Sequence, residues 1–315
     1  MDRFEAMAIV LAVAEAGSLS AAARRRKTPL ATVSRKLSEL EARLETKLFN
    51  RSSRALVLTD AGRAFVAASK RILADLAEAE RAAAGEFATP RGDLVLSAPV
   101  ALGRIMLLPV VGDFLKAFPE VDVQLGLQDR LVNLVEEHVD AALRIGVLAD
   151  SSLIAVRLGE IRRVVCASPA YLKARGMPKS PEGLKGHECI SFAPLVSPAS
   201  WSFARNGTEF AVPVKSRLVV SNLDSACDAA RADMGIAMAF SYNVAASIKD
   251  GTLITLLDGY QPPPMPVSLV YATGRFMPIK LRAFLDFASP RLKQGLATVM
   301  ACCDGAKRRT ATPKR

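Results

Sequence analysis

The sequence predicts an α+β protein of more than one domain: a small, mainly helical N-terminal domain, one long helix, and a larger C-terminal α/β domain. Helical spacing of apolar residues dominates the first 88 residues, whereas strand-like and helical segments alternate from residue 93 onwards. The positive charge is localised, because residues 18–71 carry 13 basic and four acidic side chains and residues 72–303 carry 23 of each sign. Such a basic block on a chain of net charge +11 indicates a polyanionic partner, most often nucleic acid.

The N-terminal segment predicts two short helices in succession. Apolar residues recur at helical spacing from Phe4 to Ala14, and Gly17 is placed to end that helix. Ser18 is a favourable N-cap for a second helix over residues 19–25. The sequence Lys-Thr-Pro at 27–29 ends this second helix, so a third helix is expected to begin at Pro29 or Leu30.

The third helix has two distinct faces. A buried stripe is expected at spacings of three and four, and it comprises Val33, Leu37, Leu40 and Leu44. The solvent side is expected to present Thr32, Arg35, Lys36, Glu39 and Arg43. Two strand-like runs follow at 47–51 and 55–59, joined by a polar turn. This order predicts a winged helix-turn-helix, and the alternative is a small helical bundle whose basic face is merely solvated.

A fourth helix is predicted from Thr59, as its cap, to about Ala88. Apolar residues form a seam along it: Ala61, Phe65, Ala68, Ile72, Leu76, Ala79 and Ala83. At 1.5 Å per residue the helix would be roughly 40 Å long, which exceeds what a small domain can bury. We expect it to serve as a linker and a dimerisation element, and the alternative is that it packs on its own C-terminal domain.

The C-terminal part begins after a helix-breaking Thr-Pro-Arg-Gly sequence at 89–92. Strands are expected at 93–97, 121–127, 141–145, 163–167, 211–220, 235–239 and 267–271. Helices are expected at 100–118, 131–137, 223–232 and 279–292. This alternation predicts a parallel sheet with crossover helices.

Several protein classes do not fit the sequence. The apolar run at 7–14 is flanked by acidic residues, and no run approaches the ~18–20 apolar residues that a membrane span needs. The five cysteines are odd in number and irregularly spaced, which favours the reducing cytoplasm over a disulfide framework or a zinc site. We therefore expect a cytoplasmic protein without membrane association.

An enzymatic function has little support. His138 and His187 lack the context of a known catalytic motif, and Gly103 and Gly112 do not form a phosphate-binding loop. We expect no enzyme, cofactor or metal, and the alternative is a metabolic enzyme fused to a DNA-binding domain. A further alternative is a redox-responsive regulator that uses Cys166, Cys189 or Cys227, whereas the adjacent pair at 302–303 would not close easily into a disulfide.

Short sequence motifs identify the chain more closely. The N-terminal domain contains AGSLSAAAR at 16–24, TVSRKL at 32–37, LE at 40–41, LF at 48–49, RSSR at 51–54 and LTDAG at 58–62. The C-terminal domain contains LP at 108–109, FPEV at 118–121, DAALRIG at 140–146, ASPAYL at 167–172 and GIA at 235–237. Over residues 1–297 the chain resembles LysR-type transcriptional regulators.

The resemblance implies a domain organisation and a function. It implies a winged helix-turn-helix DNA-binding domain at 1–58, a linker and dimerisation helix at 59–90, and an effector-binding domain at 91–297. That last domain is similar to periplasmic binding proteins, with subdomain I at 91–160 and 268–297 and subdomain II at 161–267. We expect residues 298–315 to be a disordered basic tail. The implied function is a sequence-specific transcriptional regulator whose operator binding is modulated by a small-molecule effector.

The implied partners are double-stranded DNA, a small-molecule effector that is a carboxylate or an aromatic compound, further copies of the chain, and RNA polymerase. Members of the family assemble as homodimers or dimers of dimers.

The third helix is expected to enter the major groove. Thr32 and Arg35 are the candidate base-reading residues, and Ser34 and Lys36 are candidate phosphate contacts. Many family members have Gln-Pro or Gln-Ala where this chain has Leu30 and Ala31, which offer only apolar contact, for instance to a thymine methyl group. The candidate DNA-binding set is completed by Ser18, Ser20, and Arg51 and Arg54 of the wing.

The candidate effector site begins where the strand ending at Ser97 leads into a helix. Pro99, Val100 and Ala101 mark a helix start, and the backbone N–H groups of Val100 and Ala101 suit an anion such as a carboxylate. A second polar loop opens a helix at Asn222 and Asp224, and the resemblance implies Ile145, Gly146 and Phe192 as candidate walls. Many relatives have hydroxyl residues where this chain has Val-Ala, which favours a less polar ligand, and the alternative is that these residues are only helix caps.

Overall fold

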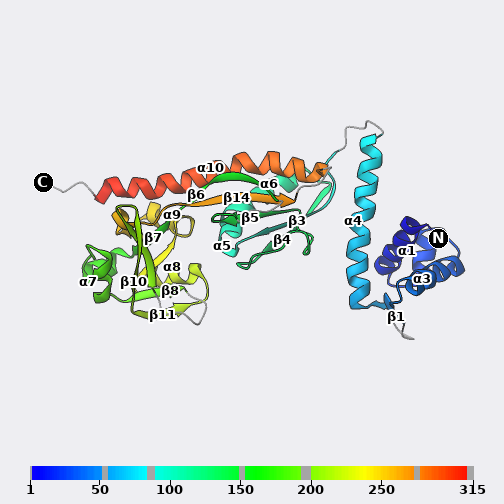
Figure 1. The fold of residues 1–315 in the computed structure, drawn as a ribbon, viewed down its shortest axis with the longest axis horizontal. Helices are drawn as coiled ribbons and strands as arrows, with labels where there is room; N and C mark the ends of the chain where they lie inside the picture. The colour runs from blue at the N-terminus through cyan, green and yellow to red at the C-terminus, as the bar shows by residue number, and fades with distance from the viewer. Residues whose placement is uncertain are drawn as a thin grey trace. The chain divides into compact units, whose positions relative to one another are not determined.

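The computed structural model describes residues 2–51, 56–83, 89–148, 153–192, 200–272 and 277–310. The chain divides into two compact units, Met1–Thr89 and Pro90–Arg315 (Figure 1). Each unit has its own hydrophobic core, so each is described by itself.

The first unit is a winged helix-turn-helix followed by a long helix. Its elements are α1 (Arg3–Ala16), α2 (Leu19–Arg25), α3 (Leu30–Arg43), β1 (Phe49–Arg51), β2 (Leu56–Leu58) and α4 (Asp60–Ala83). Gly17 ends α1 in the left-handed conformation at φ 65°, and the Ser18 hydroxyl caps α2 by accepting the N–H of Ala21 at 3.1 Å. Strands β1 and β2 pair antiparallel. The predicted helix-turn-helix and its caps are therefore confirmed.

The core of this unit joins α1, α2 and α3. Val10 and Val13 of α1 pack with Val33 and Leu37 of α3, and all four are fully buried. The expectation that Leu44 shares this stripe is wrong, because Leu44 follows the last residue of α3 and its side chain is 37% exposed. The stripe on α3 therefore ends one turn earlier than the sequence pattern suggested.

Helix α4 is fixed to the wing at its first turn. Thr59 caps it by accepting the N–H of Gly62 at 2.9 Å, as predicted. A side chain at Gly62 would place its Cβ 2.0 Å from the carbonyl oxygen of Leu48, so only glycine fits there. Phe65 and Val66 then pack on the core of the first unit. The helix was predicted to reach Ala88, and residues 84–88 lie outside the described residues.

The second unit contains two five-stranded sheets, which we call the first and second subdomains. The first sheet has the order β4-β3-β5-β14-β6, and its strands are β3 (Gly92–Ala98), β4 (Val121–Leu127), β5 (Ala141–Ile145), β6 (Leu153–Ile161) and β14 (Met265–Ala272). The second has the order β11-β8-β12-β7-β13, and its strands are β7 (Arg163–Ala167), β8 (Cys189–Phe192), β11 (Ser216–Val220), β12 (Ile236–Phe240) and β13 (Ile254–Leu256). A separate hairpin joins β9 (Ser200–Arg205) and β10 (Thr208–Pro213).

Neither sheet is purely parallel, which corrects the sequence expectation. In the first sheet β3, β4 and β5 are parallel, but β14 runs antiparallel to both β5 and β6. In the second sheet β7 runs antiparallel to β12 and β13. The reason is the chain path: it crosses from the first sheet to the second at Arg162 and returns as β14 from Met265, three residues before the expected crossing. The single strand expected at 211–220 is divided between β10 and β11.

Helices cover both sheets. They are α5 (Val100–Leu102), the π-helical η1 (Gly103–Leu107), α6 (Leu108–Ala117), α7 (Pro169–Arg175), the 3₁₀ turns η2 (Pro181–Gly186) and η3 (Asp258–Tyr260), α8 (Leu223–Arg231), α9 (Ser241–Asp250) and α10 (Ile279–Thr310). Because α5, η1 and α6 follow one another without a break, the helix predicted at 100–118 is present in three segments.

The helix predicted at 131–137 is absent, and turns occupy this segment of the described chain. Arg130 forms an ion pair with Glu137 (2.6 Å), which also accepts the N–H of Asn133 at 3.1 Å. These contacts close the segment into a loop. His138, at φ 56°, lies at its end.

Helix α10 lies along both subdomains (Figure 1). Leu296 and Val299 belong to the core of the first sheet, and Cys303 belongs to the core of the second. The expected disorder of residues 298–315 is therefore wrong for 298–303, where these buried side chains hold the helix in place, and α10 continues to Thr310. Residues 311–315 lie outside the described residues.

Among the described helices, no single one is long and apolar enough to cross a membrane. Helices α1 and α2 pass such a test only as a pair bent by 115°.

Candidate functional site

The exposed face of α3 is the first candidate site. Ala31, Arg35, Ser38 and Ala42 lie on the side opposite the buried stripe and are exposed to solvent. The Arg35 side chain is 68% exposed, and the Glu39 carboxylate lies 3.7 Å from it. Such a weak surface pair leaves the guanidinium available to another acceptor. Ser38 was not singled out from the sequence, although its spacing from Arg35 places it on this face.

Lys36 does not lie on the exposed face, which corrects the sequence expectation. Its ammonium forms an ion pair with Glu5 of α1, and only 17% of the side chain is exposed. The position borders the α1 contact, so the long side chain lies along the neighbouring helix. Lys36 therefore holds α3 against α1.

The remaining DNA-binding candidates surround this face. Leu30 is 48% exposed, whereas Thr32 and Ser34 are partly buried. The Ser18 hydroxyl is used as a helix cap and lies 3.4 Å from the Ser20 hydroxyl. Arg51 lies in β1 with an undescribed side chain, and Arg54 lies outside the described residues.

Glu41 connects α3 to the wing, a role that the sequence analysis missed. Its side chain is 2% exposed, and its Oε1 accepts the N–H groups of Leu48 at 2.8 Å and Phe49 at 3.2 Å. Lys47 donates to the other oxygen at 3.2 Å. Burial alone would raise the pKa of Glu41, but the two backbone donors and Lys47 outweigh it and lower the pKa below its usual value. A glutamate directly after Leu40, at the edge of the buried stripe, was the available sequence signal.

The second candidate site is a cavity of about 490 Å³ in the second unit, which we call the effector cavity. It lies between the β3–α5 connection of the first subdomain and the start of α8 in the second. Seven of the eight predicted residues line it: Pro99, Val100, Ala101, Ile145, Phe192, Asn222 and Asp224. Gly146 is not among the lining residues; its backbone N–H donates to the Pro266 carbonyl at 2.8 Å. Sequence reasoning missed further lining residues, including Gln128, Asp129, Arg130, Arg144, Leu223, Phe240, Tyr242 and Met265.

The start of α5 already has an anionic partner. The backbone N–H of Val100 donates to the Asp129 carboxylate at 3.0 Å. The donor that we expected to bind a ligand carboxylate is therefore satisfied by the protein itself, and the fixed negative charge opposes a second anion there.

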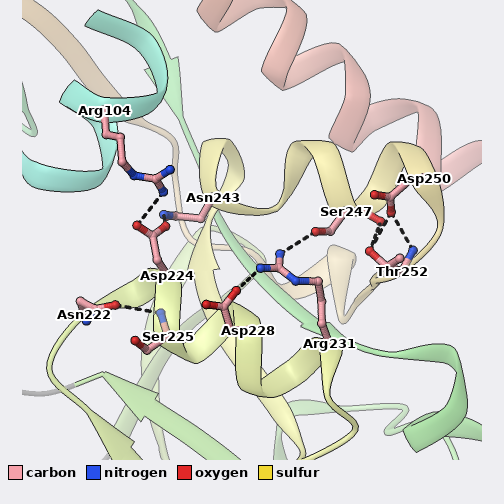
Figure 2. Close-up of polar contacts among 10 residues, drawn as sticks. All are labelled: Arg104, Asn222, Asp224, Ser225, Asp228, Arg231, Asn243, Ser247, Asp250 and Thr252. Atoms are coloured by element: carbon pink, nitrogen blue, oxygen red, sulfur yellow. Dashed lines mark hydrogen bonds and ion pairs between the residues drawn. The ribbon is translucent and has the colours of Figure 1, made fainter. Parts of the chain in front are cut away.

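A polar network beside the effector cavity joins the two subdomains (Figure 2). Arg104 of η1 donates to Asp224 of α8 at 2.7 Å, and the Asn243 amide of α9 donates to the other carboxylate oxygen at 3.1 Å. Asn222 caps α8 by accepting the N–H of Ser225 at 2.8 Å. The first turn of α8 is thus bound to the first subdomain by a charged contact.

Two arginines that line the cavity, Arg130 and Arg144, also have hydrogen-bond partners. Arg130 pairs with Glu137, which lowers the pKa of Glu137 chiefly through that hydrogen bond. Arg144 donates to the carbonyl of Val132, and burial lowers the pKa of Arg144 while Glu137 partly offsets the effect. The loop at 128–139 therefore forms one edge of the cavity, and its charged side chains bind groups within the same loop or close to it.

Tyr242 contributes a neutral hydroxyl to the cavity. The residue is 5% exposed, and burial, followed by the nearby carboxylates of Asp129 and Asp224, raises the pKa of Tyr242 above its usual value. The phenol remains protonated at neutral pH and can donate a hydrogen bond to a ligand.

Burial shifts the pKa of His187, Cys189 and Cys227 from their usual values. Burial and Arg175 lower the pKa of His187, whose ring nitrogen lies 3.4 Å from the Tyr171 hydroxyl. Burial raises the pKa of both Cys189 and Cys227 to about 12, so their thiols are unreactive at neutral pH. Within the described ranges, no group of three or more His, Cys, Asp or Glu side chains is arranged to hold a metal ion.

Known proteins match the chain over nearly its whole length. The family model described as "LysR substrate binding domain" matches residues 88–293, and "Bacterial regulatory helix-turn-helix protein, lysR family" matches residues 4–63. An HTH-type transcriptional regulator of Xanthomonas campestris pv. campestris is 32% identical over 299 residues, which cover 94% of this chain and 87% of that protein.

Solved structures agree with these matches. CrgA, a LysR-type transcriptional regulator from Neisseria meningitidis, is similar with a TM-score of 0.60 at 31% identity, covering 91% of this chain and 98% of that chain. Full-length AphB, the Vibrio cholerae virulence activator, gives a TM-score of 0.58 at 27% identity with the same coverage. With its helix-turn-helix and effector-binding domains, the chain belongs to the LysR family of transcriptional regulators.

Proposed function

We propose that this regulator binds operator DNA by placing the exposed face of α3 in the major groove, and that a small molecule in the effector cavity modulates the binding. The observation that carries the first part is the exposed Arg35, opposite a fully buried stripe, in the segment that holds the basic excess of the chain. No catalytic activity belongs to this proposal.

Individual contacts follow from exposure and chemistry. Arg35 and Thr32 read base edges, with Arg35 suited to the two acceptors of a guanine. Leu30 and Ala31 offer apolar contact to a thymine methyl group, and Ser34 contacts phosphate. We assign Lys36 to the support of α3 in place of a phosphate contact.

Four other residues complete the proposed interface. Ser18 and Ser20 contact the backbone beside α2, and Arg51 and Arg54 of the wing contact the backbone or a narrow minor groove.

Fluorescence anisotropy with DNA from upstream of the gene, at two salt concentrations, tests the DNA interface. Arg35→Ala should weaken operator binding by about 1–3 kcal/mol and relax base preference. Arg43→Ala, an exposed arginine in the last turn of the same helix, is the matched control. If Arg35→Ala binds the operator with wild-type affinity and selectivity, α3 does not form the DNA interface.

The size and lining of the effector cavity support a small, largely apolar ligand. Its volume of about 490 Å³ lies within the range of small-molecule sites. Pro99, Val100, Ala101, Ile145 and Phe192 provide apolar contact, while Asn222, Asp224 and Tyr242 provide polar groups. Modulation requires that the ligand bind one arrangement of the two subdomains better than another.

Thermal-shift screening of the full-length chain with small carboxylates and aromatic compounds identifies candidate effectors. DNase footprinting then tests modulation: a ligand that raises Tm should change the footprint or the operator bend. A ligand that binds the effector cavity and leaves footprint and bend unchanged would overturn modulation without affecting the DNA interface.

We further propose that the chain acts as a homodimer or a dimer of dimers assembled through α4. Ile72 is 41% exposed on that helix, whereas Ala79 and Ala83 of the predicted seam have no described side chains. Ile72→Glu should reduce the assembly measured by light scattering, and Ala74→Glu, on another face of α4, is the control. An unchanged mass for Ile72→Glu would exclude this face.

As a regulator of transcription, the chain would act in the cytoplasm together with RNA polymerase. In the proposed domain division, residues 1–58 bind DNA, 59–90 link and dimerise, and 91–297 bind the effector.

A further inference from the structure

A second cavity adjoins the effector cavity inside the second subdomain. Its volume is about 310 Å³, and it shares Phe192, Leu223 and Phe240 with the effector cavity. We call it the side cavity. Because three residues line both spaces, the two cavities are immediate neighbours.

The walls of the side cavity are largely aromatic. Trp201 of β9 is 6% exposed, and Phe192 at the end of β8 is 41% exposed despite its size. Phe240 and Met238 of β12 are partly buried and complete the apolar lining. Aromatic and thioether side chains around an open space suit a flat ring.

One cation lines this space. Arg163, the first residue of β7, is partly buried beside its strand partner Phe240. No described residue forms a hydrogen bond or an ion pair with its guanidinium.

The other arginines around the two cavities have partners. Arg104 pairs with Asp224, Arg130 pairs with Glu137, and Arg144 donates to a backbone carbonyl. The effector cavity itself holds the carboxylates of Asp129 and Asp224. An anionic group is therefore disfavoured beside these two carboxylates and favoured at Arg163.

We propose that the side cavity is the carboxylate-binding end of the effector site, and that the effector is a small aromatic carboxylate. Its carboxylate pairs with Arg163, and its ring lies against Trp201 and Phe192. This inference rests on the proposed effector function, since it names the ligand class of that site. A charge-assisted, bidentate contact between guanidinium and carboxylate supplies both affinity and orientation.

The sequence supplies its own reporter, because Trp201 is the only tryptophan of the chain. Fluorescence titration of the full-length protein uses benzoate and phenylacetate as probes, with benzamide and phenylacetamide as uncharged analogues. We expect saturable changes in Trp201 emission with the carboxylates at millimolar concentrations or below. The amides should bind with an affinity about tenfold lower than that of the carboxylates, as expected for loss of a charge-assisted pair.

Substitutions identify the cation. Arg163→Gln should weaken carboxylate binding about tenfold and leave amide binding unchanged, whereas Arg163→Lys, which keeps the charge, should fall between the two. Arg175→Gln, at another arginine of the second subdomain, is the matched control. If Arg163→Gln does not fold, the comparison of Arg163→Lys with the wild type, and of carboxylates with amides, decides the question.

Three results would overturn the inference: equal affinity for carboxylates and amides, wild-type carboxylate affinity in Arg163→Gln, or no emission change with either carboxylate. Operator anisotropy in the presence of saturating benzoate separates this failure from that of the proposed function. A carboxylate that binds through Arg163 without changing operator binding supports the side cavity and contradicts effector modulation. A ligand that changes operator binding but binds Arg163→Gln as tightly as the wild type supports effector modulation and contradicts the assignment of the side cavity.

Discussion

Arg104 and Asp224 are 120 positions apart in the sequence, and their side chains meet at 2.7 Å beside the effector cavity, which Asp224 lines. Arg104 belongs to the first subdomain and Asp224 to the second, where Asn243 binds the other carboxylate oxygen at 3.1 Å. The pair therefore reports on the relative position of the two subdomains directly. Because Asp224 also lines the effector cavity, a ligand that binds Asp224 there competes with Arg104 for the same carboxylate.

Asp224→Asn should loosen this connection between the subdomains. Both side chains are partly exposed, so the loss in unfolding free energy should stay below about 1 kcal/mol. Hydrogen exchange measured by mass spectrometry should nevertheless accelerate at residues 222–231. Arg157→Ala removes an exposed pair within one strand, Arg157 with Glu160 at 3.5 Å, and serves as the control. Equal exchange in the wild type and Asp224→Asn would contradict a connecting role.

Glu41→Gln should weaken the attachment of the wing to α3. The amide oxygen can still accept one N–H, but the charge that binds Leu48, Phe49 and Lys47 is lost. The N-terminal domain should lose about 1–2 kcal/mol of unfolding free energy, measured by chemical denaturation. Glu39→Gln, exposed on the same helix, should change stability by less than about 0.5 kcal/mol. Similar losses in both variants would assign no special role to Glu41.

The same carboxylate predicts an acid sensitivity. Because the pKa of Glu41 is lower in the folded state than in the unfolded chain, its contribution is complete above the unfolded value of about 4.3. It is lost as the pH falls through the folded value. Denaturation of the wild type at about pH 3 and at neutral pH should show a larger difference than in Glu41→Gln. A variant with an undiminished pH dependence would show that other carboxylates dominate.

Removal of residues 298–315 should destabilise the effector-binding domain. Val299 and Cys303 are 9% and 5% exposed, and burial of such side chains is worth about 1.5–3 kcal/mol each. We expect a loss of about 3–5 kcal/mol and a lower Tm in calorimetry. Thr298→Ala, which changes an exposed position of the same helix, should be nearly neutral. A truncated chain with wild-type Tm would mean that α10 beyond residue 297 contributes no packing energy.

Native thiol titration should label Cys302 before the other cysteines. Cys302 is partly exposed, whereas Cys166, Cys189, Cys227 and Cys303 are buried. Burial also raises the pKa of Cys166 well above its usual value, so its thiol is protonated at neutral pH. The buried thiols should react only on unfolding, and peroxide should leave operator affinity of Cys302→Ser unchanged. Rapid native labelling of Cys227 would favour the redox-responsive alternative.

Local features of the fold were predictable from the sequence. Gly17, Ser18 and Thr59 act as helix boundaries through interactions with neighbours only a few residues away. The segment 131–137 was not, because its apolar spacing is helical but the Arg130–Glu137 pair closes it as a loop. In this loop conformation Val132 and Leu134 are also buried against Ala142 and Val270, and such tertiary packing outweighs the small differences in helix propensity.

The residues of the candidate sites likewise include some that the sequence could predict and some that it could not. Pro99, Val100, Ala101, Asn222 and Asp224 could be placed because strand-to-helix connections at the same edge of a sheet are recognisable in sequence, and Ile145 and Phe192 because of the family resemblance. The pairs Lys36–Glu5 and Val100–Asp129 join distant segments, so no local pattern indicated them. Arg163 likewise gained its place only when β7 and β12 were paired.

The late position of β14 and α10 in the sequence bears on synthesis of the chain. Strand β14 lies between β5 and β6, and α10 covers both subdomains. On the ribosome, neither subdomain can complete its core until residues 265–303 have emerged. The DNA-binding domain faces no such delay, since its core uses only the first part of the chain. We therefore expect a nascent regulator that acquires a folded DNA-binding domain well before its ligand-sensing domain, with unpaired strand edges that need protection in the interval.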